Sequence, residues 1–331
     1  MKYRLGRWAA LSALIVVLLG WGFGLHPFSQ AGQSLQVNTE RLVADLQTLA
    51  QERYTEAELA DTRSYISRQL NLAGYAVEQQ PFELQGVSGS NLIATRPGTD
   101  PTAGTFLVGA HYDSVQGSPG ADDNASAVAA ALEVARRFAH KPTSATLKVV
   151  FFDQEEQQPV GEGILGSTAF VLDETNLVGL RGAIVLEMVG YTCDTPGCQQ
   201  YPEGLELDNR RDIGDFIGVI GDTQHPELLA AFAGPSAESE LADGLESDAD
   251  SLPIITLPVP ISAAVFLPDL FRSDHAPFWI KNIGAVMVTD TADFRNPNYH
   301  QPTDTLASLD IDFLTRVTQK VVLTVETLLN S

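Results

Sequence analysis

The chain has 331 residues, of which 44% are hydrophobic, so it is long enough to bury a sizeable core in one large α/β domain or two small ones. It carries 42 acidic and 20 basic side chains, a formal net charge of −22. A surface this acidic repels phosphate backbones, which argues against nucleic acid as a partner. The sequence leaves the oligomeric state open.

The N-terminus is typical of an exported protein. Three basic residues precede an apolar stretch over residues 8–25, which just reaches the length needed to cross a bilayer. No convincing small-residue cleavage site follows, so segment 1–30 is predicted to be a membrane anchor, with a cleaved signal peptide as the alternative. Because the basic residues come first, residues 31–331, predicted to form a single domain, are expected outside the cytoplasm.

The next part of the chain predicts helix followed by a strand pair. Residues 38–75 have apolar side chains at helical spacing, and Gly74 is a helix stop signal. Residues 75–84 and 90–98 are predicted to be paired strands, the second of which ends at a Pro-Gly turn signal.

Four short apolar runs follow and are predicted to be strands buried on both faces: 105–110, 147–152, 182–186 and 284–288. Such continuous runs are typical of a parallel sheet that helices cover on both sides. We therefore predict an α/β fold, with a mixed, largely parallel central sheet in a three-layer α/β/α arrangement.

Each of these four runs leads into acids or a histidine. His111 follows the first run, the acids of segment 153–156 the second, and Glu187 the third, while the fourth leads into a segment that ends at His300. In open α/β sheets, ligands bind outside the carboxyl ends of the strands. Four such coincidences predict one site at one edge of the sheet.

Two features are predicted to be peripheral to this site. Cys193 and Cys198 flank a Pro-Gly turn signal, which in an exported protein predicts a small disulfide loop, with a metal-binding pair as the weaker alternative. Segment 238–250 is acidic but lacks the EF-hand spacing, so a solvated surface loop is favoured over a calcium site. Both lie in or near a region, 190–270, that is predicted to be insertions.

The residue types at the predicted site favour metal chemistry. Carboxylates and imidazoles are ligands that suit zinc, manganese or cobalt. The chain has no G-x-S-x-G elbow, no H-E-x-x-H motif and no phosphate-binding loop, so a serine hydrolase has little support. Several unpaired buried carboxylates would repel one another, and a divalent cation among them removes that cost.

Six short motifs, read together, are similar to those of the M28 family of zinc peptidases. In chain order they are HYDS, GADDNAS, FFDQEE with a later GS, LEMVG, SDHAPF and YHQPTDT. The resemblance spans roughly residues 40–325 and implies a zinc-exopeptidase-like fold. The family includes bacterial aminopeptidases, and its relatives include glutaminyl cyclases.

The resemblance implies two zinc ions per chain. His111, Asp123 and Glu187 would hold one, and Asp123, Glu156 and His300 would hold the other, because Asp123 matches the aspartate that bridges both metals. The best-known members have aspartate in place of Glu187. The extra methylene shifts the reach of this ligand, so the occupancy of its site is left open.

Further roles are also implied by the resemblance. Asp113 is similar to the acid that orients the imidazole two residues before it. Glu155 resembles the general base, which takes a proton from water and passes it to the leaving amine. Tyr299 resembles the phenol that stabilises the oxyanion. The family often has a cis peptide after its bridging aspartate, here Asp123–Asn124, and Asp122 would be structural or solvent-facing.

The remaining histidines, and Asp274, are not predicted to be direct metal ligands. Asp274 and His275, in SDHAPF, are predicted to support the ligands or contact substrate rather than bind metal directly. His26, His140 and His225 have no motif around them and are treated as ordinary residues.

These observations favour an aminopeptidase that uses two zinc ions to hydrolyse peptides with a free N-terminus. One alternative is a glutaminyl-peptide cyclotransferase with a single zinc, which the substituted Glu187 keeps open. A second alternative is a non-catalytic binding ectodomain, which should have lost ligands or the base. The side-chain preference and the choice between aminopeptidase, carboxypeptidase and dipeptidase action are left open.

Overall fold

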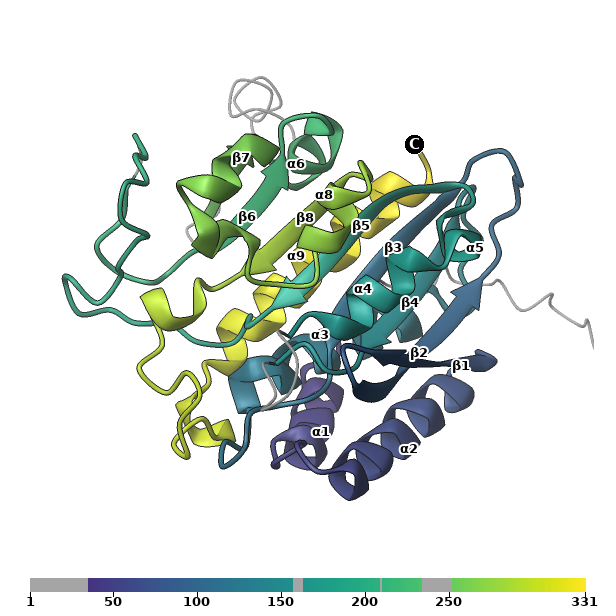
Figure 1. The fold of residues 1–331 in the computed structure, drawn as a ribbon, viewed down its shortest axis with the longest axis horizontal. Helices are drawn as coiled ribbons and strands as arrows, with labels where there is room; N and C mark the ends of the chain where they lie inside the picture. Colours follow the sequence, from purple (N-terminus) through teal and green to yellow (C-terminus); the bar gives the residue numbers. More distant parts are fainter. Residues whose placement is uncertain (1–34, 157–162, 209, 234–251) are drawn as a thin grey trace, which may run out of the picture. The chain divides into compact units, whose positions relative to one another are not determined.

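The computed structural model describes residues 35–331 except 157–162, 209 and 234–251 (Figure 1). The predicted anchor or signal, 1–30, and the acidic segment 238–250 lie outside the described residues. None of the described helices combines the length and apolar character that a membrane span requires.

In the described part of the chain, eight strands form one mixed sheet in the order β1-β2-β4-β3-β5-β8-β6-β7. Their bounds are Val77–Leu84 (β1), Val87–Arg96 (β2), Thr105–His111 (β3), Thr146–Phe152 (β4), Leu180–Glu187 (β5), Ile217–Asp222 (β6), Ile254–Val259 (β7) and Ala285–Thr289 (β8). The four central strands, β4, β3, β5 and β8, run parallel, whereas β1, β2 and β4 pair antiparallel and β6 is antiparallel to β8. The predicted strand pair and the four predicted buried strands are confirmed.

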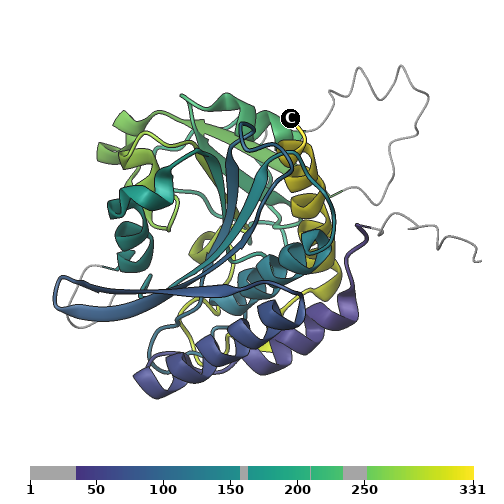
Figure 2. The same cartoon turned by 90° about the vertical axis from the view of Figure 1, so that its right-hand side faces the viewer.

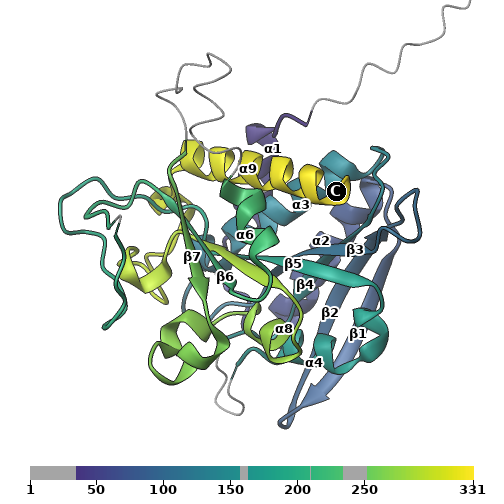
Figure 3. The same cartoon turned by 90° about the horizontal axis from the view of Figure 1, so that it is seen from above.

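Helices cover both faces of the sheet, as Figures 2 and 3 show. One layer contains α1 (Thr39–Leu49), α2 (Glu56–Leu72), α3 (Ala127–Phe138), α6 (Pro226–Ala233) and α9 (Ile311–Leu329). The other contains α4 (Leu165–Leu172), α5 (Glu174–Leu177) and α8 (Ala276–Ile280). A separate hydrophobic core lies on each face of the sheet, so the three-layer prediction is confirmed.

Local chemistry explains where the predicted helix 38–75 divides. α1 ends at Leu49, and α2 begins after Thr55, whose hydroxyl accepts from the backbone N–H of Glu58 while the Glu58 carboxylate accepts from that of Thr55. This reciprocal capping box satisfies donors that would otherwise be unpaired at the start of a helix. The segment is therefore two helices joined by a turn.

The region 190–270 is more regular than the sequence suggests. β6 and β7 both lie in it and extend the sheet beyond β8, so the description of the region as insertions is wrong for these two segments. Gly218 and Gly221 interrupt β6, and Pro258 interrupts β7, which weakens the strand pattern in the sequence.

The sheet register brings the ends of the central strands level with one another. His111 pairs with Phe152 across β3 and β4, and Gly109 pairs with Val185 across β3 and β5. Two residues beyond that last pair are His111 and Glu187, at the carboxyl ends of their strands. The segment after Phe152 begins at the same edge, where the predicted site residues were expected.

Candidate metal centre

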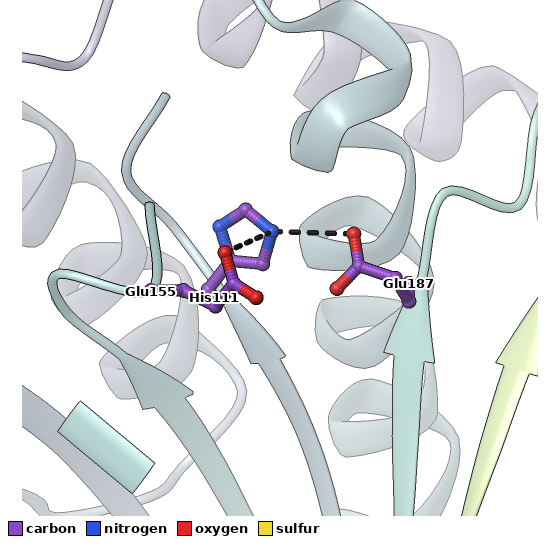
Figure 4. Close-up of side chains that lie close together, drawn as sticks. All are labelled: His111, Glu155 and Glu187. Carbon is purple, nitrogen blue, oxygen red and sulfur yellow. Dashed lines mark hydrogen bonds and ion pairs between the residues drawn. The ribbon is translucent and has the colours of Figure 1, made fainter. Parts of the chain in front are cut away.

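His111 lies at the centre of a buried cluster of acids (Figure 4). Its Nε2 is 3.3 Å from Asp123 Oδ1, 3.4 Å from Glu187 Oε1 and 3.9 Å from Glu155 Oε2. Figure 4 shows Glu155 and Glu187 approaching the imidazole from the two neighbouring strand ends. The side chain of Glu187 therefore reaches the His111 imidazole.

His300 makes a second set of contacts beside the first. Its Nε2 is 3.2 Å from Asp123 Oδ2 and 3.1 Å from Glu156 Oε2, and neither contact has hydrogen-bond geometry. Asp123 thus directs one carboxylate oxygen to each imidazole. The structure brings together all five residues that were predicted to bind metal.

Asp113 fixes the positions of both neighbouring glutamates. Its Oδ1 accepts from the backbone N–H of Glu155 and its Oδ2 from that of Glu156, both at 3.1 Å. Oδ1 also lies 3.4 Å from His111 Nδ1. This approach to the imidazole lacks hydrogen-bond geometry, so the predicted orienting role stays a prediction. The sequence did not indicate the other role of Asp113, which is to hold the segment after β4.

The turn Ala121–Ser126 is bound to the end of β5 through alternate side chains. Asp122 Oδ1 accepts from the Gly190 N–H, Asn124 Oδ1 from the Met188 N–H, and Ser126 Oγ from the Val189 N–H. Asp122 is fully buried, so of its two predicted environments the structural one is correct. The predicted cis peptide is present at Asp123–Asn124. These hydrogen bonds fix the position of Asp123 relative to Glu187.

Two residues that the sequence analysis did not single out hold the same turn from its other sides. Asp304 accepts from the backbone N–H groups of Asp122 and Asp123. Arg53, which is only 1% exposed, donates to six backbone carbonyls, those of Leu49, Gln51, Tyr112, Pro119, Gly120 and Asp123. Asp304 lies in the YHQPTDT motif, which was a usable signal, whereas Arg53 precedes every motif.

The SDHAPF motif contributes a residue to the cluster and another to the core. Ser273 Oγ donates to Glu187 Oε2 at 2.7 Å, a contact that the sequence analysis missed. His275 is fully buried, with Nε2 3.0 Å from the Leu270 carbonyl oxygen and its ring against Trp279, so it packs in the core and not against substrate. Asp274 is also fully buried, and burial raises its pKa to about 7.

The charges of the cluster are poorly matched without a cation. Burial, with the charge of Asp123, raises the pKa of Glu156 to about 8, and burial raises that of Glu155 well above its usual range. Burial alone would raise the pKa of Asp123, but His111 and His300 lower it below its usual range. Burial opposes protonation of His300, yet Asp123 and Glu156 raise its pKa to about 10. Buried carboxylates with raised pKa values and a buried imidazole nitrogen without a hydrogen bond fit a divalent cation.

The donor atoms also fit zinc in number and kind. Two groups in the described residues place one ligand atom each within 4.8 Å of one another: His111 with Glu155 and Glu187, and His111 with Asp123 and Glu156. Imidazole nitrogen and carboxylate oxygen are the donors of catalytic zinc sites. Neither group is identical to a predicted ligand set. Glu155 takes the place of Asp123 in the first group, and His111 takes the place of His300 in the second.

Eight non-glycine residues in the described part of the chain have positive φ values, and three of them lie in or next to the cluster. Gln154, Met188 and His300 have φ values of +58°, +48° and +58°, a region that non-glycine residues rarely adopt. One of these residues is a predicted ligand, and each of the others adjoins Glu155 or Glu187. Such conformations cost on the order of 1–3 kcal/mol each and cluster at functional sites.

Residues outside the cluster are placed as follows. Cys193 and Cys198 form the predicted disulfide. His225 Nδ1 is 2.8 Å from Asp222 Oδ1 at the start of α6, and His26 lies outside the described residues. His140 follows α3, next to Gly74, away from the cluster.

Two known proteins are similar in sequence to most of this chain. Uncharacterized protein YfbL of Escherichia coli K12 is 32% identical over 266 residues, 78% of this chain and 77% of YfbL. Probable lipoprotein aminopeptidase LpqL of Mycobacterium tuberculosis is 30% identical over 233 residues, 68% of this chain but only 43% of its own length.

Solved structures share the fold at low identity. The aminopeptidase from Aneurinibacillus sp. strain AM-1 superposes with a TM-score of 0.64 at 18% identity, covering 89% of this chain and 95% of its own. Glutaminyl cyclase of Porphyromonas gingivalis gives 0.61 at 18% identity, covering 88% and 98%. The fold is therefore common to proteins with both names.

The family model described as Peptidase family M28 matches residues 91–325, which include all five residues of the candidate metal centre. With the match to YfbL over most of both chains, this shows that the chain belongs to peptidase family M28.

Proposed function

We propose that this chain is a zinc-dependent aminopeptidase that removes N-terminal residues from peptides. The observation that carries the proposal is the placement of Asp123, whose two oxygens face His111 at 3.3 Å and His300 at 3.2 Å. A carboxylate shared by two imidazoles, each with its own glutamate, is the arrangement that holds a pair of metal ions. The names of several relatives, including that of LpqL, support the peptidase reaction.

The proposed ligands are His111, Asp123 and Glu187 for one zinc, and Asp123, Glu156 and His300 for the other. Zinc bound there would polarise the scissile carbonyl and make water nucleophilic near neutral pH. The chain's own contribution begins with the fixed geometry of these ligands. Asp113 fixes Glu156 through its backbone N–H, and Ser273 fixes Glu187 through its carboxylate.

Glu155 is proposed as the general base. It is buried beside His111, and burial raises its pKa, which suits a group that takes a proton from the attacking water and returns it to the leaving amine. Its backbone N–H is held by Asp113, so the carboxylate is presented from a fixed position. Tyr299 is proposed to donate its phenol proton to the oxyanion that develops on the substrate.

An apolar cavity beside Glu187 is proposed to bind the side chain of the substrate's N-terminal residue. The cavity, about 810 Å³ including the solvent at its mouth, has both Glu187 and Tyr299 among its lining residues. Many of its lining residues are apolar, among them Leu205, Leu207, Phe216, Ile255, Leu257 and Met287. Asp269, Arg272 and Asp293 also line it and contribute charge. Peptides that begin with a large apolar residue are therefore the proposed substrates.

A glutaminyl cyclase activity is the second candidate. The fold is shared with the Porphyromonas gingivalis enzyme, and one zinc held by Asp123, Glu156 and His300 would suffice for it. The close approach of Glu187 to His111 favours the peptidase, because it completes a second set of ligands. The complete set also disfavours a non-catalytic binding domain.

We further propose that the domain functions outside the cytoplasm. The disulfide between Cys193 and Cys198 requires an oxidising compartment to persist, and the relative LpqL is named a lipoprotein. The charged and apolar N-terminal segment, which is outside the described residues, would provide export or anchoring.

The experiment that tests the proposed function compares zinc-loaded wild type with Glu155→Gln on leucyl and glutaminyl anilides. Wild type should cleave the leucyl substrate and lose that activity on chelation. Glu155→Gln should keep its zinc and its melting temperature but lose about 10²–10⁴-fold in kcat. Glu227→Gln, on the exposed first turn of α6, is the matched control and should behave as wild type. Cyclisation of glutaminyl substrates without leucyl cleavage would replace the peptidase by the cyclase.

A further inference from the structure

The phenol of Tyr299 has one hydrogen-bond partner in the part of the chain that the structure describes. Arg272 Nη2 donates to Tyr299 Oη at 3.1 Å, and the guanidinium carbon lies 5.8 Å from the centre of the phenol ring. The ring also stacks on His300, with centroids 3.7 Å apart and planes 20° apart. The phenol therefore contacts both a hydrogen-bond donor and a proposed metal ligand.

Arg272 is itself held by acids from two segments. Its Nη1 lies 3.4 Å from Asp269 Oδ1, in the turn just before it, and 3.3 Å from both oxygens of Asp293, which follows β8. The next residue, Ser273, bonds the proposed ligand Glu187. Two consecutive residues thus reach the two ends of the proposed catalytic apparatus.

The donor inventory determines what this contact does. A guanidinium can donate but never accept, so Tyr299 Oη must accept from Arg272 and its own proton is left for another acceptor. Among the described residues none accepts a hydrogen bond from Tyr299 Oη. The O–H is therefore available to a group that arrives with the substrate.

We propose that Arg272 is a positioning residue that orients the Tyr299 hydroxyl towards the substrate oxyanion. This inference rests on the proposed function, because it assumes that the Tyr299 phenol donates in the transition state. Its distinguishing consequence is that Arg272 affects kcat only through Tyr299. Arg272 also lines the proposed side-chain cavity, so KM is expected to change with it. Loss of the Tyr299 contact itself should lower kcat, because that contact is used chiefly when charge develops on the substrate.

A double-mutant cycle tests this with Arg272→Met, Tyr299→Phe and the double variant, each zinc-loaded and assayed on alanyl and leucyl anilides. Tyr299→Phe should lose about 10²–10³-fold in kcat. Arg272→Met should lose roughly tenfold to a hundredfold on both substrates. The double variant should be no slower than Tyr299→Phe alone. Arg272→Lys, which keeps one donor, should recover part of the loss.

Binding provides a readout that does not depend on turnover. The readout is calorimetric titration with 1-amino-3-methylbutylphosphonic acid, a tetrahedral anion. This phosphonate should bind more weakly to Arg272→Met than to wild type. Tyr299→Phe and the double variant should bind it with the same affinity as each other. Asp293→Asn, which loosens the guanidinium, should give a smaller loss in the same direction. Arg211→Met is the control, because Arg211 is a similarly exposed arginine paired with Asp215.

The outcomes separate the two proposals. If Arg272→Met slows the Tyr299→Phe enzyme as much as it slows wild type, or if it changes only KM, the positioning role is wrong and the peptidase assignment stands. If Tyr299→Phe turns over and binds the phosphonate like wild type, the oxyanion role of Tyr299 fails, and this inference fails with it.

Discussion

Replacing Ser273 with alanine removes a single hydrogen bond, from Ser273 Oγ to Glu187 Oε2 at 2.7 Å. Ser273 is 2% exposed, so water does not readily take the place of the lost hydroxyl. A hydrogen bond to a charged group contributes about 1.5–3 kcal/mol, which is roughly a tenfold to 150-fold change in an equilibrium constant. Loss of a residue that supports a metal ligand typically costs about 10–100-fold in metal affinity, the same range.

The expected effect falls on one metal site only. Glu187 contacts His111, whereas the Asp123–Glu156–His300 set has no part in the Ser273 contact. Chelator-buffered zinc titration of Ser273→Ala should therefore show one binding event weakened about 10–100-fold and the other unchanged. Thr318→Val, which removes a buried hydroxyl in α9, should change neither event and controls for general destabilisation. Equal weakening of both events, or of neither, would refute the assignment of Glu187 to a separate site.

Two further predictions concern specificity and acid stability. Gly218 lines the apolar cavity, so Gly218→Val should fill part of it and lower the leucyl-to-alanyl ratio of kcat/KM by at least about tenfold; an unchanged ratio would mean that the cavity does not bind the substrate side chain. Burial lowers the pKa of His275 to about 4 from an unfolded value of about 6.5, so neutral His275 contributes stability that is complete above about pH 6.5 and is lost as the pH falls towards 4. The difference between the two pKa values corresponds to a loss of about 3 kcal/mol of stability. The free energy of unfolding, measured with urea, should therefore fall less steeply between these pH values in His275→Gln than in wild type. Parallel curves for the two proteins would contradict this prediction.

The central sheet could be predicted because its strands are buried on both faces and read as uninterrupted apolar runs. The same logic placed His111 and Glu187, since each follows such a run directly and the parallel register brings the ends level. The sequence did not predict β6 and β7 as strands, because glycine interrupts β6 and proline interrupts β7. At Gly221 a Cβ would lie 2.9 Å from Leu229 and Val286, so packing against α6 requires glycine where strand propensity disfavours it.

The supporting residues were harder to predict because their contacts join distant parts of the chain. Ser273 is 86 positions from Glu187 and Arg272 is 27 positions from Tyr299, so no local pattern connects them. The hydrogen bonds of the Arg53 guanidinium described above all go to backbone carbonyls, and carbonyl acceptors have no sequence signature. Residue types indicated which chemistry to expect, whereas tertiary packing determined which neighbours hold each ligand in place.

The central claim is that five side chains from separate parts of the chain hold zinc at one edge of the sheet. An anomalous difference map, collected at the zinc absorption edge from crystals of the zinc-loaded protein, tests it most directly. The account predicts two peaks, one in contact with His111, Asp123 and Glu187 and the other with Asp123, Glu156 and His300. Peaks that lie elsewhere, or zinc-loaded crystals with no peak beside Asp123, would contradict it.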